Sequence, residues 1–245
     1  MIENIPLKNI LFLDVETVPL VKDFSDLPLS LQELWVKKAA RISKDETYSA
    51  EELYFERAGI YSEFGKIVCI SAGFFYGNDE NKRFRCKAFY NDDEKQLLQE
   101  FAQLLNNQYN TSDKYLCGHN AREFDIPYIA RRMLINRIPL PEILNVPGKK
   151  PWEVSFLDTM ELWKFGDYKN YTSLALLAAV FDIPTPKDDI DGSDVAKVYW
   201  EDSELERIAV YCNKDVVTTA RLFLKLAFKG ELIDDEIEII SPKVE

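Results

Sequence analysis

The sequence contains a single histidine, His119, among its 245 residues. A zinc site built from several histidines is therefore excluded by count, and so is any mechanism that needs two of them. The chain has four cysteines that form no CxxC pair and have no metal-ligand spacing: Cys69, Cys86, Cys117 and Cys212. We therefore expect the cysteines to be small buried residues in a reducing compartment.

Long hydrophobic runs and an excess of positive charge are also missing. No apolar stretch reaches the ~18 residues of a membrane span, and the N-terminus lacks the pattern of a signal peptide, so we expect a cytoplasmic protein without membrane contact. With 30 basic and 42 acidic residues the net charge is −12, which argues against a protein that coats nucleic acid. An enzyme that handles one strand end through metal ions stays possible, because bound cations reverse the local charge.

The composition, with 47 % apolar and 29 % charged residues, fits an α/β fold. We expect one domain over residues 1–245, with a largely helical insertion at about 20–65 and an acidic, peripheral tail at about 231–245. Apolar runs and alternation predict strands at Asn9–Val15, Lys66–Phe75, Lys82–Tyr90, Lys114–Cys117 and Ser155–Asp158. Capping residues and helical spacing predict helices at Asn91–Asn107, Phe124–Asn136, Leu174–Phe181 and Ser203–Phe228. The turn residues Gly77-Asn78-Asp79 predict that the second and third strands form an antiparallel hairpin.

Two carboxylates, Asp14 and Glu16, end the first predicted strand. Positions i and i+2 of a strand share a face, so both side chains converge at the carboxyl end of a buried strand, where open α/β sheets bind ligands. Two nearby anions favour a hard divalent cation between them. The alternative is an ordinary solvated strand end.

Two further pairs of polar residues occur later in the sequence, one at the start of a predicted helix and one along the last predicted helix. Asn120 and Asp125 follow the fourth strand and open a helix, where they either reach a ligand or serve as helix-capping residues. Tyr211 and Asp215 are four residues apart and share one face of the last helix, at the edge of its apolar stripe. A carboxylate in that position is costly unless it is paired or bound to metal; the alternative is a tyrosine at the core margin beside a solvated aspartate. Asp158 either helps to hold this site or caps the helix that follows it.

The motifs Asp14-Val15-Glu16, Asn120 with Phe124-Asp125, and Tyr211 with Asp215 resemble, in this order, those of the DEDD exonuclease superfamily, in its subgroup with tyrosine in the third motif. The similarity is greatest to proofreading domains of family B DNA polymerases and to stand-alone exonucleases like them. The resemblance implies a ribonuclease H-like fold with a five-stranded mixed sheet and helices on both faces. It also implies 3′–5′ hydrolysis of single-stranded DNA with two divalent metal ions, Mg²⁺ or Mn²⁺, with exoribonuclease activity as the near alternative.

Carried over residue by residue, the resemblance implies that Asp14, Glu16, Asp125 and Asp215 hold the two metal ions and that Tyr211 orients the attacking water. It further implies that Asn120 and Phe124 contact the last two nucleotides and that the backbone of Val15 and Thr17 meets the terminal sugar. We expect no polymerase domain and therefore no proofreading in cis, and any polymerase or repair partner is unknown. A non-catalytic nucleic-acid-binding or partner-docking module is the alternative of another class, although it would have no use for four mutually repelling acids.

The insertion at about 20–65 is longer than a connection between two strands requires, and long insertions are often functional. It is a candidate lid, strand guide or docking surface. Its aromatic side chains either pack the insertion or stack on bases: Trp35, Tyr48, Tyr54, Phe55 and Tyr61. On the helix at Phe124–Asn136, Arg131 and Arg132 either contact phosphate or form a solvated helix face.

Overall fold

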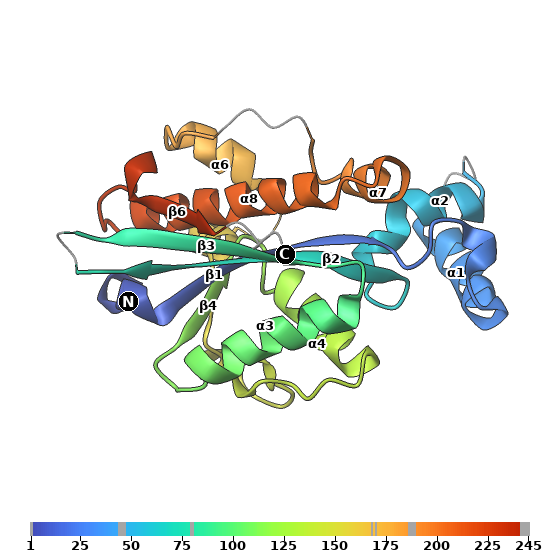
Figure 1. The fold of residues 1–245 in the computed structure, drawn as a ribbon, viewed down its shortest axis with the longest axis horizontal. Coiled ribbons are helices and arrows are strands. Elements are labelled where there is room, and N and C mark those ends of the chain that lie inside the picture. The colour runs from blue at the N-terminus through green and yellow to red at the C-terminus, as the bar shows by residue number, and fades with distance from the viewer. Residues whose placement is uncertain are drawn as a thin grey trace.

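A computed structural model describes residues 2–43, 48–78, 81–167, 169, 171–185 and 190–240. Its centre is a six-stranded mixed sheet in the order β5-β4-β1-β2-β3-β6 (Figure 1). The strands are β1 Ile10–Pro19, β2 Gly65–Tyr76, β3 Arg83–Tyr90, β4 Tyr115–Gly118, β5 Phe156–Asp158 and β6 Ile237–Ile240. The helices are α1 Leu29–Ile42, α2 Ala50–Arg57, α3 Glu94–Gln108, α4 Asp125–Ile135, α5 Thr159–Lys164, α6 Leu174–Val180, α7 Val195–Lys197 and α8 Leu205–Leu226. Asp79, in the predicted turn, lies outside the described residues.

Strand directions confirm the fold class predicted from the sequence. β2 runs antiparallel to both β1 and β3, which is the predicted hairpin, while β4 and β5 run parallel to β1. This mixed order, with one antiparallel strand beside the central β1, is that of a ribonuclease H-like fold. Within the described residues no helix is long and apolar enough to cross a membrane.

The sheet has one strand more than the five that we expected. β6 lies in the segment assigned to a peripheral acidic tail, yet it pairs parallel with β3, from Phe84 beside Ile237 to Lys87 beside Ile240. Ile237, Ile239 and Ile240 have the branched side chains that favour strands, and the surrounding acids hide this short run from a composition-based reading. Residues 237–240 are therefore an edge strand of the sheet, which the sequence did not predict.

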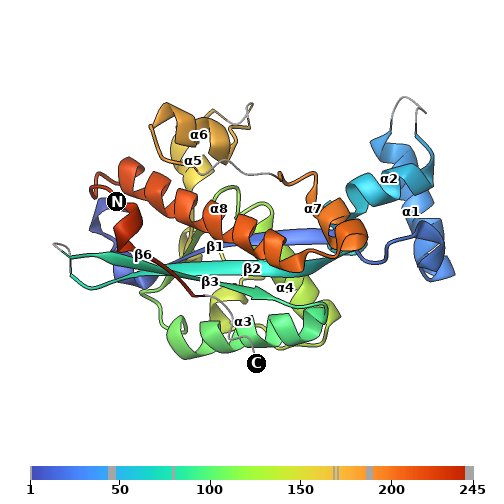
Figure 2. The same cartoon turned by 45° about the horizontal axis from the view of Figure 1, so that its top comes forward.

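Helices cover both faces of the sheet, as Figure 2 shows, with α8 on one face and α3 and α4 on the other. Alternation along β1 sorts its side chains between these faces. Leu11, Leu13 and Val15 pack in the core that contains α3 and α4, whereas Ile10 and Phe12 pack in the core that contains α8. Asp14 and Glu16 follow Ile10 and Phe12 at the same two-residue spacing, so both carboxylates lie on the face of the sheet that α8 covers.

The insertion between β1 and β2 is helical, as expected, and it folds around a small core of its own. Leu27, Trp35, Leu53 and Tyr54 are buried in that core. The Trp35 and Tyr54 rings meet edge to face, with centroids 5.5 Å apart. Helix α2 begins with a capping box in which Ser49 and Glu52 bond each other's backbone N–H. In Figure 1 the insertion lies at the end of the sheet toward which β1 runs.

Candidate active site

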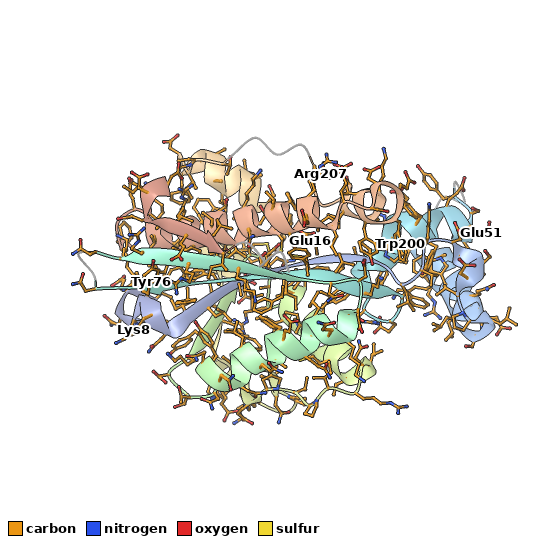
Figure 3. All side chains as sticks on the ribbon, viewed as in Figure 1. Lys8, Glu16, Glu51, Tyr76, Trp200 and Arg207 are labelled. Carbon is orange, nitrogen blue, oxygen red and sulfur yellow. The ribbon has the colours of Figure 1, made fainter. Side chains whose placement is uncertain are left out.

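Glu16 lies on β1 beneath α8 (Figure 3), and Asp14, two residues earlier on the same strand, contacts Cys212 of α8. The pairing of β1 with β2 shifts register between Glu16 and Thr17, where β2 carries one extra residue, Val68, so a β-bulge in β2 lies next to the second carboxylate. Bulges bend a strand and re-aim its side chains, and they are common beside active sites. The strand period places both carboxylates on one face of the sheet, and the bulge in β2 lies directly beside the second of them.

Helix α8 supplies the opposite side of the site. Cys212 on α8 packs against the sheet, and its Sγ lies 3.4 Å from Oδ2 of Asp14 and 3.5 Å from the Asp14 carbonyl oxygen. Tyr211 precedes it and Asp215 follows one turn later, and these two side chains are hydrogen-bonded to each other. The predicted pairing of Tyr211 and Asp215 on one helix face is therefore present next to Asp14.

Asp125 reaches the site from the other side of β1, because β4 is short. The last residue of β1 that pairs with β4 is Phe12, so the backbone N–H of Val15 lies beyond the end of β4. The Val15 N–H instead donates to Oδ1 of Asp125 at 3.1 Å. Asp125 is the first residue of α4 and is 4 % exposed, and it is thereby fixed beside Asp14.

The carboxylates repel one another. Burial, followed by the charges of Asp125 and Asp215, raises the pKa of Asp14 well above its usual range. Burial and the Asp14 charge do the same to the pKa of Glu16. Burial raises the pKa of Asp125 to about 7 although the hydrogen bond from Val15 opposes the shift. The charge interactions among these four acids are repulsive, so a cation bound between them lowers their energy.

The donor set fits a hard divalent cation. In the part of the chain that the structure describes, ligand atoms of Asp14, Glu16 and Cys212 lie within 4.8 Å of one another. Burial, with Cys69 and the nearby acids, raises the pKa of the Cys212 thiol, so its Sγ stays protonated and donates to Asp14. Mg²⁺ and Mn²⁺ prefer oxygen ligands, which leaves the carboxylates as the ligating groups. Asp125 and Asp215 stand outside the group of three but close enough to raise the pKa of Asp14.

The loop between β4 and α4 carries the residues that the resemblance assigns to substrate binding. Asn120 has a left-handed backbone, with φ of 61°, and its N–H donates to Asp158. The side-chain oxygen of Asn120 is buried and has no hydrogen-bond partner among the described residues. A buried amide oxygen without a partner is costly, and a ligand donor would satisfy it. The N-cap of α4 is Phe124, so Asn120 is not the capping residue of that helix.

Asp158 at the end of β5 both holds this loop and caps a helix. Its carboxylate accepts from the N–H groups of Asn120 and Arg122 in the loop, and from those of Met160 and Glu161 in the first turn of α5. Both alternatives that the sequence left open are therefore realised in one side chain. The only histidine, His119, is hydrogen-bonded to Thr159 and to the Thr172 carbonyl. These bonds hold the start of the loop, directly before Asn120.

Two residues near the site were not singled out by sequence reasoning. Cys212 was counted only among the buried cysteines, all four of which are indeed buried and free. Tyr171 is exposed and meets the His119 ring edge-on, with centroids 6.5 Å apart. Partial desolvation and the charges of Asp125 and Asp14 raise the pKa of its phenol, so Tyr171 lies near the acids. The position of Cys212 directly after Tyr211 was a usable signal; nothing in the sequence marked Tyr171.

The buried acids predict a pH dependence of stability. We expect the metal-free protein to lose stability as pH rises from the ordinary Asp125 pKa of 3.8 toward its raised value of about 7. Within this window the unfolded chain has released the proton that the folded chain still holds, so rising pH favours unfolding. Thermal melts in EDTA of the wild type and Asp125→Asn isolate this effect, because the variant has no carboxyl group to titrate there. A difference between the two that stays constant across the window contradicts the prediction, and Mn²⁺ should restore the wild type at the upper end.

Comparison with known proteins adds the family. Among solved structures, the RNase domain of the yeast Pop2 protein aligns with 97 % of this chain and 84 % of its own, at 12 % identity and a TM-score of 0.44. No curated protein sequence matches the chain.

A family model described as "Predicted 3'-5' exonuclease related to the exonuclease domain of PolB" matches residues 60–243, which is most of the chain. The matched segment contains Asp125, Tyr211 and Asp215. It begins after Asp14 and Glu16, which the pairing of β1 with β2 and β4 brings to the matched part. The resemblance and the enzyme class predicted from the sequence are thereby confirmed, and the chain belongs to the family of predicted 3′–5′ exonucleases related to the exonuclease domain of PolB.

Proposed function

We propose that this protein removes nucleotides one at a time from the 3′ end of single-stranded DNA by a two-metal-ion mechanism. The observation that carries the proposal is the cluster of mutually repelling carboxylates at Asp14, Glu16, Asp125 and Asp215 beside a neutral tyrosine; Glu16 and Asp125 are buried, and Asp14 and Asp215 are half-buried. Membership of an exonuclease family and an acidic protein surface both favour a substrate met through cations at one strand end.

In this proposal Asp14, Glu16 and Asp215 hold one divalent cation, and Asp14 and Asp125 support a second. When bound, the ions lower the pKa of a water molecule and offset the charge that develops on the leaving oxygen. The hydrogen bond from Val15 fixes the Asp125 carboxylate, so this ligand is oriented before any ion arrives. The Cys212 thiol on α8 donates a hydrogen bond to the Asp14 carboxylate and orients this ligand in the same way.

Tyr211 acts by position. Burial and the Asp215 charge raise the pKa of its phenol, and it donates a hydrogen bond to Asp215. A phenol that is neutral at physiological pH is a poor base, so Tyr211 orients the attacking water and does not deprotonate it. Asn120 and Phe124 bind the last two nucleotides, and the backbone of Val15 and Thr17 meets the terminal sugar.

The test is the degradation of 5′-labelled single-stranded DNA and RNA oligonucleotides with Mg²⁺, with Mn²⁺ and with EDTA. We expect a ladder that shortens from the 3′ end with either metal, release of nucleoside monophosphates, and no products in EDTA. Faster decay of the DNA would support the proposed substrate, whereas faster decay of the RNA would make the protein an exoribonuclease with the same site. Internal cuts, or no cleavage by folded protein with either metal, would leave the proposal without support and favour a non-catalytic binding module.

A further inference from the structure

A cleft of about 750 Å³ opens beside the carboxylates, with Glu16 in its wall. Its floor is the end of β1 together with Phe124, one side is the insertion, and the other side is the segment that leads into α8. Pockets of about 300–1,000 Å³ typically hold small ligands. The cleft therefore has room for one nucleotide next to the proposed metal ligands.

The insertion turns apolar side chains into this cleft. Phe55 on α2 and Ile60, shortly after α2, both line the cleft. Ile60 is 48 % exposed. The other four aromatic residues singled out in the insertion lie elsewhere. Trp35 and Tyr54 are buried in the insertion's own core, and Tyr61 packs against Trp35. Tyr48 is exposed but does not line the cleft. Of the five aromatic residues considered from the sequence, Phe55 is thus the one available to a ligand in the cleft.

The insertion wall is fixed to the strand and helix that carry the catalytic groups. The Tyr128 hydroxyl on α4 donates to the carbonyl of Gly59 at 2.8 Å, and Arg132 on α4 donates to the carbonyl of Ser62 at 2.9 Å. Gly59 lies so close to β1 that a Cβ there would stand 3.2 Å from the backbone of Val18. The Phe124 ring leans on Tyr128, with centroids 5.4 Å apart. These contacts keep the wall at a constant distance from the floor.

The opposite side of the cleft is formed by Glu201 in the π-helix Val198–Asp202, a type of helix that is frequent at functional sites, and by five residues before it: Gly192, Ser193, Asp194, Ala196 and Lys197. Trp200 of the π-helix donates to the Pro19 carbonyl at 3.2 Å, which ties this side to the end of β1 (Figure 3). Four acidic residues line the whole cleft against one lysine, Lys197, so phosphates there would be repelled wherever no cation is bound: Glu16, Glu56, Asp194 and Glu201. The charge of the lining therefore favours a single base and sugar in the cleft over a run of phosphates.

We propose that the insertion forms a fixed wall of the 3′-terminal nucleotide site, in which Phe55 and Ile60 contact an unpaired terminal base across from Phe124. The proposal rests on the proposed exonuclease function and names the residues of the insertion that contact the terminal base. A base-paired end would bring its partner strand against the wall, and the wall is held in place. The protein thereby selects unpaired 3′ ends, and the base contact is tolerant of sequence because every base has a π-face.

Steady-state kinetics on a 5′-labelled single-stranded oligonucleotide test the wall. We expect Phe55→Ala and Phe55→Leu, and to a smaller extent Ile60→Ala, to raise KM about tenfold with kcat changed by less than about twofold, the pattern of lost binding that is equal in ground and transition states. Phe55→Leu keeps apolar volume and so guards against an effect of misfolding. Tyr48→Ala, another aromatic substitution in the same insertion, is the matched control and should leave KM unchanged.

A binding measurement separates this proposal from the proposed function. An oligonucleotide with 2-aminopurine as its 3′-terminal base should lose fluorescence when Asp14→Asn protein binds it in Mn²⁺, and Phe55→Ala added to that protein should weaken binding about tenfold. If the Phe55 variants behave like Tyr48→Ala while the wild type hydrolyses DNA, the wall proposal is overturned and the exonuclease stands. If the wild type does not hydrolyse but terminal-base binding depends on Phe55, the nucleotide site stands and the exonuclease falls. If neither hydrolysis nor a Phe55-dependent signal is seen, both are overturned.

Discussion

Replacing Asp14 by asparagine should lower kcat for 3′-end hydrolysis by roughly a thousandfold or more while making the metal-free protein more stable. The loss of activity follows because Asp14 is the carboxylate that both proposed ions share, and metal ions supply several kcal/mol of transition-state stabilisation, each ~1.4 kcal/mol of which is a factor of ten. Single-turnover hydrolysis of a labelled oligonucleotide in Mg²⁺ measures the effect without interference from product release.

The gain in stability has a separate physical cause. In the metal-free protein, burial and the charges of Asp125 and Asp215 make an ionised Asp14 costly, and asparagine removes that charge at nearly the same volume. We expect a rise in melting temperature of about 2–4 °C in EDTA, the shift that roughly 1 kcal/mol produces in a chain of this size. Mn²⁺ should stabilise the wild type strongly and the variant weakly, because the ion binds the folded carboxylate cluster.

Asp23→Asn is the matched control, since Asp23 is an exposed aspartate in the insertion. It should leave both hydrolysis and the response to Mn²⁺ at the wild-type level. A variant at Asp14 that keeps hydrolysis within about tenfold of the wild type would remove Asp14 from the metal site. A variant that loses activity and melts earlier in EDTA would show that Asp14 stabilises the fold, contrary to the repulsion argued above.

Local patterns in the sequence were sufficient for the parts of the site that depend on one element. The spacing of Asp14 and Glu16 places them on one face of any strand, and the spacing of Tyr211 and Asp215 places them on one face of any helix. In the structure each pair occupies one face as expected, next to the other pair. Their roles as metal ligands and as the water-orienting residue stay predictions, as do those of Asn120 and Phe124.

What the sequence did not reveal depends on contacts between distant segments. The hydrogen bond that fixes Asp125 joins it to Val15, 110 positions away, and arises because β4 stops early beside β1. The bulge in β2 beside Glu16 is a property of strand pairing and has no signature in one strand alone. β6 needs the free edge of β3, and its four residues carry too weak a pattern to be recognised without that edge. Whether residues 1–245 form a single domain stays a prediction.

Arg132 gives the second large effect, and it corrects an expectation. Both alternatives considered for Arg131 and Arg132, a phosphate contact and a solvated face, fail for Arg132, which is buried and paired with Glu94 on α3 at 2.5 Å. We expect Arg132→Met to lower the free energy of unfolding by about 3–5 kcal/mol, because the buried Glu94 carboxylate loses the positive charge it is paired with and keeps the neutral donors Ile67 N–H and Asn136. The melting temperature should fall by on the order of 10 °C.

Arg131→Met is the matched control, because this neighbouring arginine is exposed on the same helix, and it should change stability by less than about 0.5 kcal/mol. Denaturant unfolding of both variants, with the m-value checked for constancy, measures the difference. Equal stability of the two variants would mean that the Glu94 carboxylate finds water or another donor when Arg132 is removed.

The Arg132 pair also links the core to the proposed nucleotide cleft. Glu94 accepts from the backbone N–H of Ile67 at the start of β2, while Arg132 donates to Ser62 in the returning limb of the insertion. The double variant Arg132→Met with Glu94→Leu removes both charges but leaves the Ile67 N–H unpaired, so it should recover only part of the lost stability. The double variant also loses the hydrogen bond from Arg132 to the Ser62 carbonyl. We therefore expect its KM for single-stranded DNA to be higher than that of the wild type, even at temperatures where the variant is fully folded. A KM equal to that of the wild type would show that the cleft wall is held without this contact, by Tyr128 and the packing of Gly59 on β1.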